Sequence, residues 1–113
     1  MHELSIAMNI LEIVEDYTSR ENTKKVLELE LDIGDLLGIE IPALKFALET
    51  TKEGSILESS VIVINAIQAQ VQCQDCQSVF TAKTQFEPCP ECQSFFSIIQ
   101  SGNELKVKSI LIE

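Results

Sequence analysis

The sequence predicts an α+β fold: two helices and a small mixed three-stranded sheet, with a module of four cysteines inserted between two strands. Three observations predict it. The spacing of apolar residues changes from helical to alternating between residues 20 and 27, and a second helical segment is followed by a second extended run. All four cysteines lie close together just before a final apolar run.

Two segments have apolar residues at helical spacing. Residues 3–20 carry an apolar stripe opposite polar positions, with Glu3 in the first turn, where a carboxylate suits the helix dipole. The second helix begins at Pro42, which has no N–H to lose in a first turn, and ends near Gly54. The apolar positions are Leu4, Ala7, Met8, Leu11 and Val14 in the first helix, and Leu44, Ala47 and Leu48 in the second.

The first strand covers residues 25–33, where apolar and acidic residues alternate. Such alternation indicates a strand with one buried face. The apolar face carries Leu27, Leu29, Leu31 and Ile33, and the other carries Glu28, Glu30 and Asp32.

Residues 57–72 form the next extended run, and its Val-Ile-Val-Ile segment at 61–64 predicts burial on both faces. Residues 95–100 and 104–112 are strand-like and joined at 101–103 by Ser-Gly-Asn, a hairpin signal. We expect the last strand to return to the sheet begun by the first two. The cysteine module, with Val79, Phe80 and Phe86 as a small core, is then an insertion.

The cysteines form two Cys-x-x-Cys pairs, Cys73 with Cys76 and Cys89 with Cys92, with twelve residues between the pairs. Two such turns brought together make a tetrahedral cage of four sulfurs, which suits Zn²⁺. We therefore expect a structural zinc ion in a zinc-ribbon-like module. Iron fits the same ligands, and two disulfides are the alternative in an oxidising compartment.

The chain has 113 residues and a net charge of −10. An acidic surface repels phosphate backbones, so we expect no nucleic-acid partner. No apolar stretch of about 18 residues is present, so we expect no membrane span. Acidic residues stand where a signal peptide has a basic region. The composition predicts a cytoplasmic protein, and we expect a monomer or a weak homodimer.

The only histidine, His2, lies between Met1 and Glu3. The terminal amine, the backbone nitrogen of His2 and its Nδ1 can close adjacent chelate rings, and the backbone nitrogen of Glu3 adds a fourth donor. Four nitrogens in a plane suit Ni²⁺ or Cu²⁺, and the first N–H groups of a helix lack intrahelical acceptors. Such a site releases its metal in acid. A terminal histidine without function is the alternative.

Short motifs along essentially the whole chain resemble, in order, the HypA/HybF family of hydrogenase nickel-incorporation proteins. The opening pentapeptide together with the cysteine quartet is the specific part. The motifs are Met-His-Glu-Leu-Ser at 1–5, Ile-Gly-Asp-Leu at 33–36, Gly-Ile at 38–39, Ala-Leu-Lys-Phe-Ala at 43–47, the cysteine pairs at 73–76 and 89–92, Gly-Asn-Glu-Leu at 102–105 and Val-Lys-Ser-Ile at 107–110.

The resemblance implies a nickel metallochaperone for the maturation of [NiFe] hydrogenase. Its transient Ni²⁺ cargo is bound by the amine of Met1, the backbone nitrogen and imidazole of His2 and the backbone nitrogen of Glu3. The Glu3 side chain is either a further ligand or a group that supports the ligands. The implied partners are a HypB-type GTPase and the precursor of the hydrogenase large subunit. Residues 1–70 and 104–113 then form the nickel-binding domain, and residues 71–103 the zinc-binding domain.

Three residues depart from the family pattern. Asp35 stands where Glu is usual, which is a mild change. Gln77 and Gln93 follow the cysteine pairs, where Gly is common because the turn can require positive φ. A non-glycine residue at such a position costs on the order of 1 kcal/mol, so these two residues affect the turn geometry and not the ligands.

Two other functions compete with that of a nickel chaperone. A zinc-ribbon adaptor would bind a protein partner and leave the N-terminus inert. An enzyme is disfavoured because zinc held by four cysteines has no open coordination position, and the chain has no phosphate-binding glycine loop.

Overall fold

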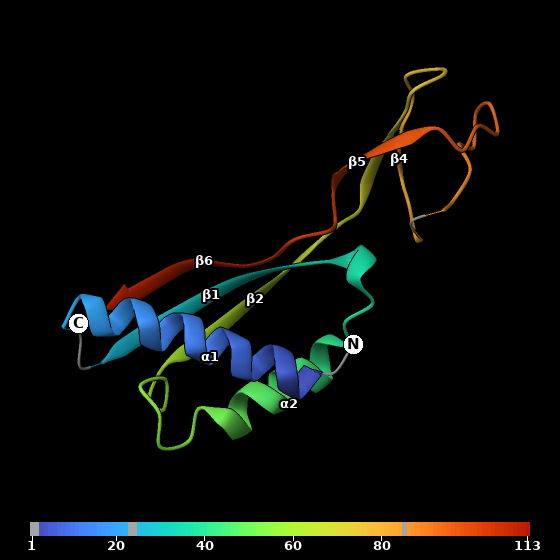
Figure 1. Ribbon diagram of the computed structural model, residues 1–113. Coiled ribbons are helices and arrows are strands. Elements are labelled where there is room, and N and C mark those ends of the chain that lie inside the picture. The colour runs from blue at the N-terminus through green and yellow to red at the C-terminus, as the bar shows by residue number, and fades with distance from the viewer. Residues whose placement is uncertain (1–2, 23–24, 85) are drawn as a thin grey trace. The chain divides into compact units, whose positions relative to one another are not determined.

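The computed structural model describes residues 3–22, 25–84 and 86–113 (Figure 1). Contacts group them into two units. The first comprises the described parts of Met1–Leu31 with Ile39–Ile64 and Val107–Glu113, and the second comprises Asp32–Gly38 and the described parts of Asn65–Lys106. The assignment of separate nickel-binding and zinc-binding domains stays a prediction. Among the described residues, every helix is too short or too polar to cross a membrane.

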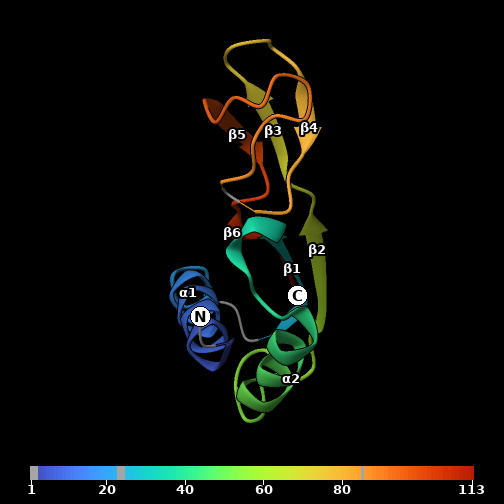
Figure 2. The same cartoon turned by 90° about the vertical axis from the view of Figure 1, so that its right-hand side faces the viewer.

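Two helices build one layer of the first unit, α1 (Glu3–Arg20) and α2 (Ile41–Thr51). They lie side by side against the sheet (Figures 1 and 2). The buried face of α1 is rotated from the predicted stripe, because Leu4 and Met8 are about half exposed. The residues that α1 buries are Ile6, Ala7, Ile10, Val14 and Thr18.

The sheet has the strand order β2-β1-β6, with β1 (Val26–Gly34) in the centre, β2 (Val61–Ile67) on one edge and β6 (Leu105–Ile112) on the other. Leu29, Leu31 and Ile33 of β1 are buried as the alternation predicts, and Glu28 and Glu30 of the opposite face are partly exposed. The prediction is wrong at the two ends of the pattern, because Leu27 is exposed and Asp32 is buried.

The sheet is mixed, as predicted. The Ser60 hydroxyl donates to the Val26 carbonyl at 2.5 Å, which sets the start of β2 beside the start of β1, so these strands run parallel. The N–H of Glu113 donates to the Lys25 carbonyl at 3.2 Å, which sets the end of β6 beside the start of β1. The last strand therefore returns antiparallel to the first.

The prediction that residues 61–64 are buried on both faces is wrong. Val61 is 61% exposed, and Ile62, Val63 and Ile64 are only half-buried. The reason is that α1 and α2 leave the other face of the sheet open and β2 is an edge strand. β-branched side chains favour an extended backbone, but they do not decide how many faces are covered.

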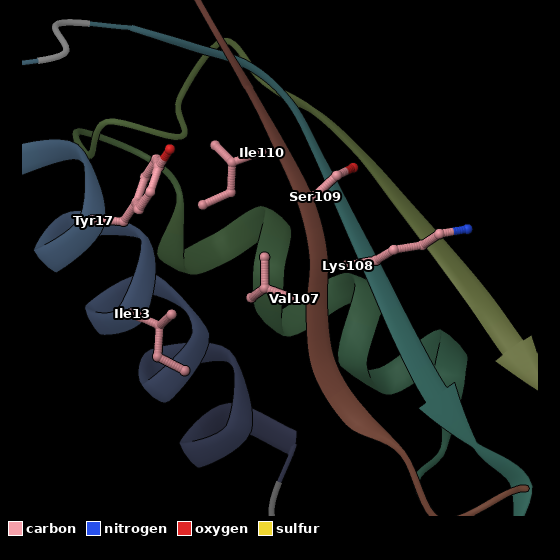
Figure 3. A pocket seen from close by; sticks show the side chains of 6 residues that line it. All are labelled: Ile13, Tyr17, Val107, Lys108, Ser109 and Ile110. Atoms are coloured by element: carbon pink, nitrogen blue, oxygen red, sulfur yellow. The ribbon is translucent and has the colours of Figure 1, made fainter. Parts of the chain in front are cut away.

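The edge strand β6 loses its alternation in the middle. Val107 and Ile110 point toward α1, whereas Lys108 and Ser109 both point away (Figure 3). Both outward side chains contact Glu30 of β1, Lys108 at 3.4 Å and Ser109 at 3.2 Å. Two consecutive residues on one face are the mark of a β-bulge. The inward pair lines a shallow pocket of about 330 Å³ with Ile13 and Tyr17.

The second unit holds a small antiparallel sheet of order β4-β3-β5. Its strands are β3 (Gln70–Cys73), β4 (Val79–Thr81) and β5 (Ser97–Ser101). Its core contains Leu36, from the 3₁₀ turn Asp35–Leu37, together with Ala69, Val71 and Ala82, and Phe80 and Ile99 pack against it. The predicted small core is right for Phe80 and wrong for two residues, because Val79 is 53% and Phe86 83% exposed.

The predicted hairpin at residues 101–103 is also wrong, because β5 and β6 belong to different sheets. Gly102 instead carries the chain from one sheet to the other with φ of +104°. Its carbonyl accepts the Leu36 N–H at 2.8 Å. A Cβ on Gly102 would lie 2.5 Å from the Ala69 Cα, and one on Gly34 would lie 2.1 Å from the Gly102 oxygen. Both glycines therefore allow backbones to approach where any side chain would collide.

We expect Gly102→Ala to lower the free energy of unfolding by about 2–4 kcal/mol, because the methyl group overlaps Ala69 and the residue keeps a positive φ. Gly38→Ala is the matched control: Gly38 has φ of +68°, but an added Cβ there meets nothing within 4 Å. That variant should lose only about 1–2 kcal/mol. Urea denaturation followed by circular dichroism measures both. Equal losses would contradict the close approach.

Candidate metal centre

Each cysteine pair lies in a tight turn, or knuckle, held by its own backbone. In the first, the Gln77 N–H donates to the Cys73 carbonyl at 3.0 Å, and the Cys73 N–H donates to the Ser78 carbonyl at 2.9 Å. The same two bonds, at 2.8 Å each, recur in the second knuckle, residues 89–94. Both knuckles share the sequence Cys-x-x-Cys-Gln-Ser, so the same residues produce the same turn twice.

The two knuckles bring the four predicted sulfur ligands together. All four Sγ atoms lie within 4.8 Å of one another. The Cys73 and Cys92 sulfurs are 3.5 Å apart, and those of Cys76 and Cys89 are 3.6 Å apart. A tetrahedron with Zn–S bonds of about 2.3 Å has edges of about 3.8 Å, so the cage fits zinc. All four cysteines are free thiols. The structure therefore differs from the alternative in which they form two disulfides.

The two exposed thiols, Cys76 and Cys92, have pKa values shifted in opposite directions. The Ser78 hydroxyl and then the Ser78 backbone lower the pKa of Cys76 to about 6. The Ser94 backbone lowers the pKa of Cys92, but the neighbouring thiols, led by Cys73, and burial outweigh it and raise that pKa to about 12. Thiolates this close repel one another, so the four thiols do not all lose their protons without a cation. A divalent cation removes that obstacle, so the donor set favours a metal with four thiolates.

The knuckles are also joined to each other. The Ser94 hydroxyl donates to the Asp75 carboxylate at 2.5 Å, and the Gln74 N–H donates to the Phe96 carbonyl at 2.7 Å. Cys73 and Cys89 are fully buried, while Cys76 and Cys92 are exposed. Sequence reasoning missed the roles of Ser78 and Ser94. The repeated Gln-Ser after each cysteine pair was the available signal.

Positive φ at the two glutamines is confirmed. Gln77 has φ of +67° and Gln93 has φ of +65°, the left-handed region that favours glycine. The Gln77 side chain offsets part of this strain, because its amide donates to the Gln74 carbonyl at 3.0 Å and its oxygen accepts from Gln72 at 3.3 Å.

We expect Gln93→Gly to stabilise the metal-bound module by up to about 1 kcal/mol, because glycine adopts this backbone without strain. Gln77→Gly should gain less, since it also loses the two side-chain hydrogen bonds. Competition with a zinc chelator, followed by thermal unfolding, measures the difference. A less stable Gln93→Gly protein would show that the knuckle needs the glutamine side chain.

Of the predicted nickel ligands, Met1 and His2 lie outside the described residues. Glu3 begins α1, and its carboxylate accepts a hydrogen bond of 3.4 Å from the Glu40 N–H, at the residue that precedes α2. The Glu3 side chain thus joins the beginnings of the two helices. Its backbone nitrogen remains a predicted nickel ligand.

The chain is similar to known proteins over its full length. The model of a family described as hydrogenase/urease nickel incorporation, metallochaperone, HypA matches residues 1–112. A hydrogenase maturation factor HypA from Parabacteroides distasonis is 46% identical, covering 100% of this chain and 98% of that protein. The factor of the same name from Psychromonas ingrahamii is 38% identical, with coverage of 100% and 99%.

Two solved structures share the fold. The solution structure of the nickel metallochaperone HypA from Helicobacter pylori has a TM-score of 0.70 at 24% identity, covering 99% of this chain and 97% of that one. Another solution structure of a HypA protein has a TM-score of 0.72 at 24% identity, with coverage of 100% and 97%. These likenesses establish the two helices, the small sheets and the cysteine module as one known fold.

Proposed function

Because the chain belongs to the HypA family of hydrogenase/urease nickel-incorporation metallochaperones, we propose that it binds Ni²⁺ at its own N-terminus and delivers the ion to the [NiFe] hydrogenase large-subunit precursor. A partner GTPase of the HypB type drives the delivery, which takes place in the cytoplasm. The observation that carries the proposal is the sequence Met1-His2-Glu3, of which Glu3 begins α1, in the same chain as a closed cage of four sulfurs.

The nickel ligands are the amine of Met1, the backbone nitrogen and imidazole of His2, and the backbone nitrogen of Glu3. These nitrogens suit the square-planar geometry of Ni²⁺. The Glu3 carboxylate supports the site from outside by holding the start of α2. Protons compete with the metal for the amine, the amides and the imidazole, so binding weakens as the pH falls. Weak, proton-linked binding suits a cargo that must leave.

The resident metal is Zn²⁺, held by Cys73, Cys76, Cys89 and Cys92. Its role is to fold the second unit, since four thiolates close the coordination sphere and leave no position for water or substrate. The protein is therefore a carrier without catalysis of its own, and nucleotide hydrolysis belongs to the partner GTPase.

Complementation tests delivery. In cells that lack their own nickel-incorporation factor, the wild-type chain should restore hydrogenase activity at low nickel. His2→Ala should fail at low nickel and recover when nickel is supplied in excess, because only the supply of metal is impaired. Failure of the wild-type chain to restore any activity would contradict the assignment of hydrogenase as the client.

A protein-binding adaptor is the second candidate, and the exposed aromatic residues of the second unit favour it. Phe86, Phe95 and Phe96 are 70–83% exposed, and exposed apolar side chains of this size are common where proteins dock. The same complementation separates the two functions. An adaptor with an inert N-terminus keeps its activity with His2→Ala at every nickel concentration.

A further inference from the structure

The hydroxyl of Ser97, at the start of β5, is buried and has no hydrogen-bond partner in the described part of the chain. Folded proteins leave few buried polar groups unpaired, so each such group needs an explanation. Other serine hydroxyls of the same unit are paired. The Ser94 hydroxyl donates to Asp75, and the Ser101 hydroxyl donates to the Gln68 carbonyl at 2.8 Å. The Ser97 hydroxyl is therefore available to donate a hydrogen bond.

Ser97 lies directly opposite Cys73, because β5 pairs with β3 in an antiparallel register that matches these two residues. The backbone bonds show which type of pair they form. The Gln74 N–H donates to the Phe96 carbonyl at 2.7 Å, whereas the Cys73 N–H donates within its own knuckle. Cys73 and Ser97 are thus a non-hydrogen-bonded pair, the type in which opposed Cα atoms lie about 4.5 Å apart and side chains are closest.

The two side chains lie on the same face of the sheet. Residues two apart in a strand point the same way, so Cys73 shares its face with Val71, and Ser97 shares its face with Ile99. Val71 and Ile99 pair in register and pack together in the core of the second unit. The Ser97 hydroxyl therefore stands on the face that carries Cys73 and, with it, the four-sulfur cage.

Cys73 is the sulfur ligand for which a neighbouring donor matters most in this sheet. Four thiolates around one divalent cation carry an excess of negative charge, and buried charge is stabilised by hydrogen-bond donors. The Cys76 sulfur is exposed to water and lies 3.2 Å from the Ser78 hydroxyl. Cys73 is fully buried, so its thiolate needs a donor from the protein.

We propose that the Ser97 hydroxyl donates a hydrogen bond to the Cys73 thiolate when the cage holds its metal, which makes Ser97 a positioning residue of the metal centre. The inference rests on the proposed zinc site. Such a bond is stronger to a thiolate than to a neutral thiol, because it is charge-assisted. Ser97 therefore favours the metal-bound form, as groups that orient and stabilise ligands from outside do at other metal sites.

Competition between the full-length protein and a zinc chelator tests the proposal. Ser97→Ala should still bind one zinc ion per chain, with a dissociation constant raised about tenfold, the low end of the range for groups outside the ligand set. Ser97→Thr keeps the hydroxyl on a residue that suits a strand and should bind zinc as tightly as wild type. Ser101→Ala is the matched control. It removes a hydroxyl from the same strand, but opposite Gln70, and should leave the zinc affinity unchanged.

Cobalt(II) in place of zinc reports on the sulfurs directly. A hydrogen bond lowers the energy of the sulfur lone pairs, so its loss moves the sulfur-to-cobalt charge-transfer bands to longer wavelength. We expect this shift in Ser97→Ala and in neither Ser97→Thr nor Ser101→Ala.

Two results would overturn the proposal while leaving the zinc site intact. An unchanged zinc affinity in Ser97→Ala is the result for a hydroxyl that stays unpaired, since its removal then costs nothing. A weakened affinity with unshifted cobalt bands would mean that Ser97 acts through packing alone. A wild-type protein that binds neither zinc nor cobalt would instead overturn the metal site itself, and this inference with it.

Discussion

Replacing Cys73 with serine is expected to reduce bound zinc from one ion per chain to none and to unfold the second unit. Cys73 is fully buried. It supplies one sulfur of the four-sulfur cage and takes part in both backbone hydrogen bonds of its knuckle. A serine hydroxyl is a poor ligand for zinc beside three thiolates. Structural zinc contributes about 10–16 kcal/mol of apparent binding free energy to small zinc-finger domains, so loss of the metal should unfold the module.

Metal analysis gives the zinc content of the Cys73→Ser protein, and amide hydrogen exchange reports which residues lose protection. We expect residues 70–101 to lose protection while α1 and α2 keep theirs. Ser101→Ala is the control, because the Ser101 hydroxyl donates to the Gln68 carbonyl, at the end of β5 that lies away from Cys73. That variant should keep its zinc. Stoichiometric zinc in the Cys73→Ser protein would refute the four-sulfur assignment.

Replacing His2 with alanine is expected to weaken Ni²⁺ binding by more than about 100-fold, since even outer-shell changes at metal sites cost about 10–100-fold. The substitution removes the imidazole and one chelate ring but leaves the amine and the amides. Isothermal titration with Ni²⁺, on protein with its native N-terminus, measures the change.

Glu3→Gln is the matched control for the nickel site. It keeps every backbone nitrogen and removes only the side-chain charge beside Glu40. We expect this variant to weaken Ni²⁺ binding by about tenfold, the low end of the range for a group outside the ligand set, because it keeps a side chain of the same shape beside Glu40. A loss as large as that of His2→Ala would make the Glu3 carboxylate a direct ligand.

Local patterns in the sequence predicted much of the fold and of the zinc site. The alternation at Leu29, Leu31 and Ile33 predicted the central strand and its buried face. The spacing of the cysteines predicted a cage, because each knuckle is closed by bonds within six residues. The positive φ of Gln93 followed from the same local turn.

Features set by distant residues were not predictable in this way. The Val-Ile-Val-Ile run is typical of a strand wherever it lies, but its edge position depends on where α2 and β6 pack. Gly102 was interpreted as part of a hairpin, whereas its conformation serves the close approach to Ala69 and Gly34. Phe86 is apolar and yet exposed, because the second unit closes its core around Leu36, a residue from a different part of the chain.

The central claim is that the terminal amine of Met1 and the residues after it hold the nickel cargo. A comparison of Ni²⁺ titrations between protein with its native N-terminus and protein carrying extra residues before Met1 tests this claim most directly. The native protein should bind one Ni²⁺ per chain at about pH 7.5 and release it as the pH is lowered, because protons compete for the amine, the amides and the imidazole. The extended protein should keep its zinc and lose the nickel site. Equal nickel binding by the two proteins would contradict the account.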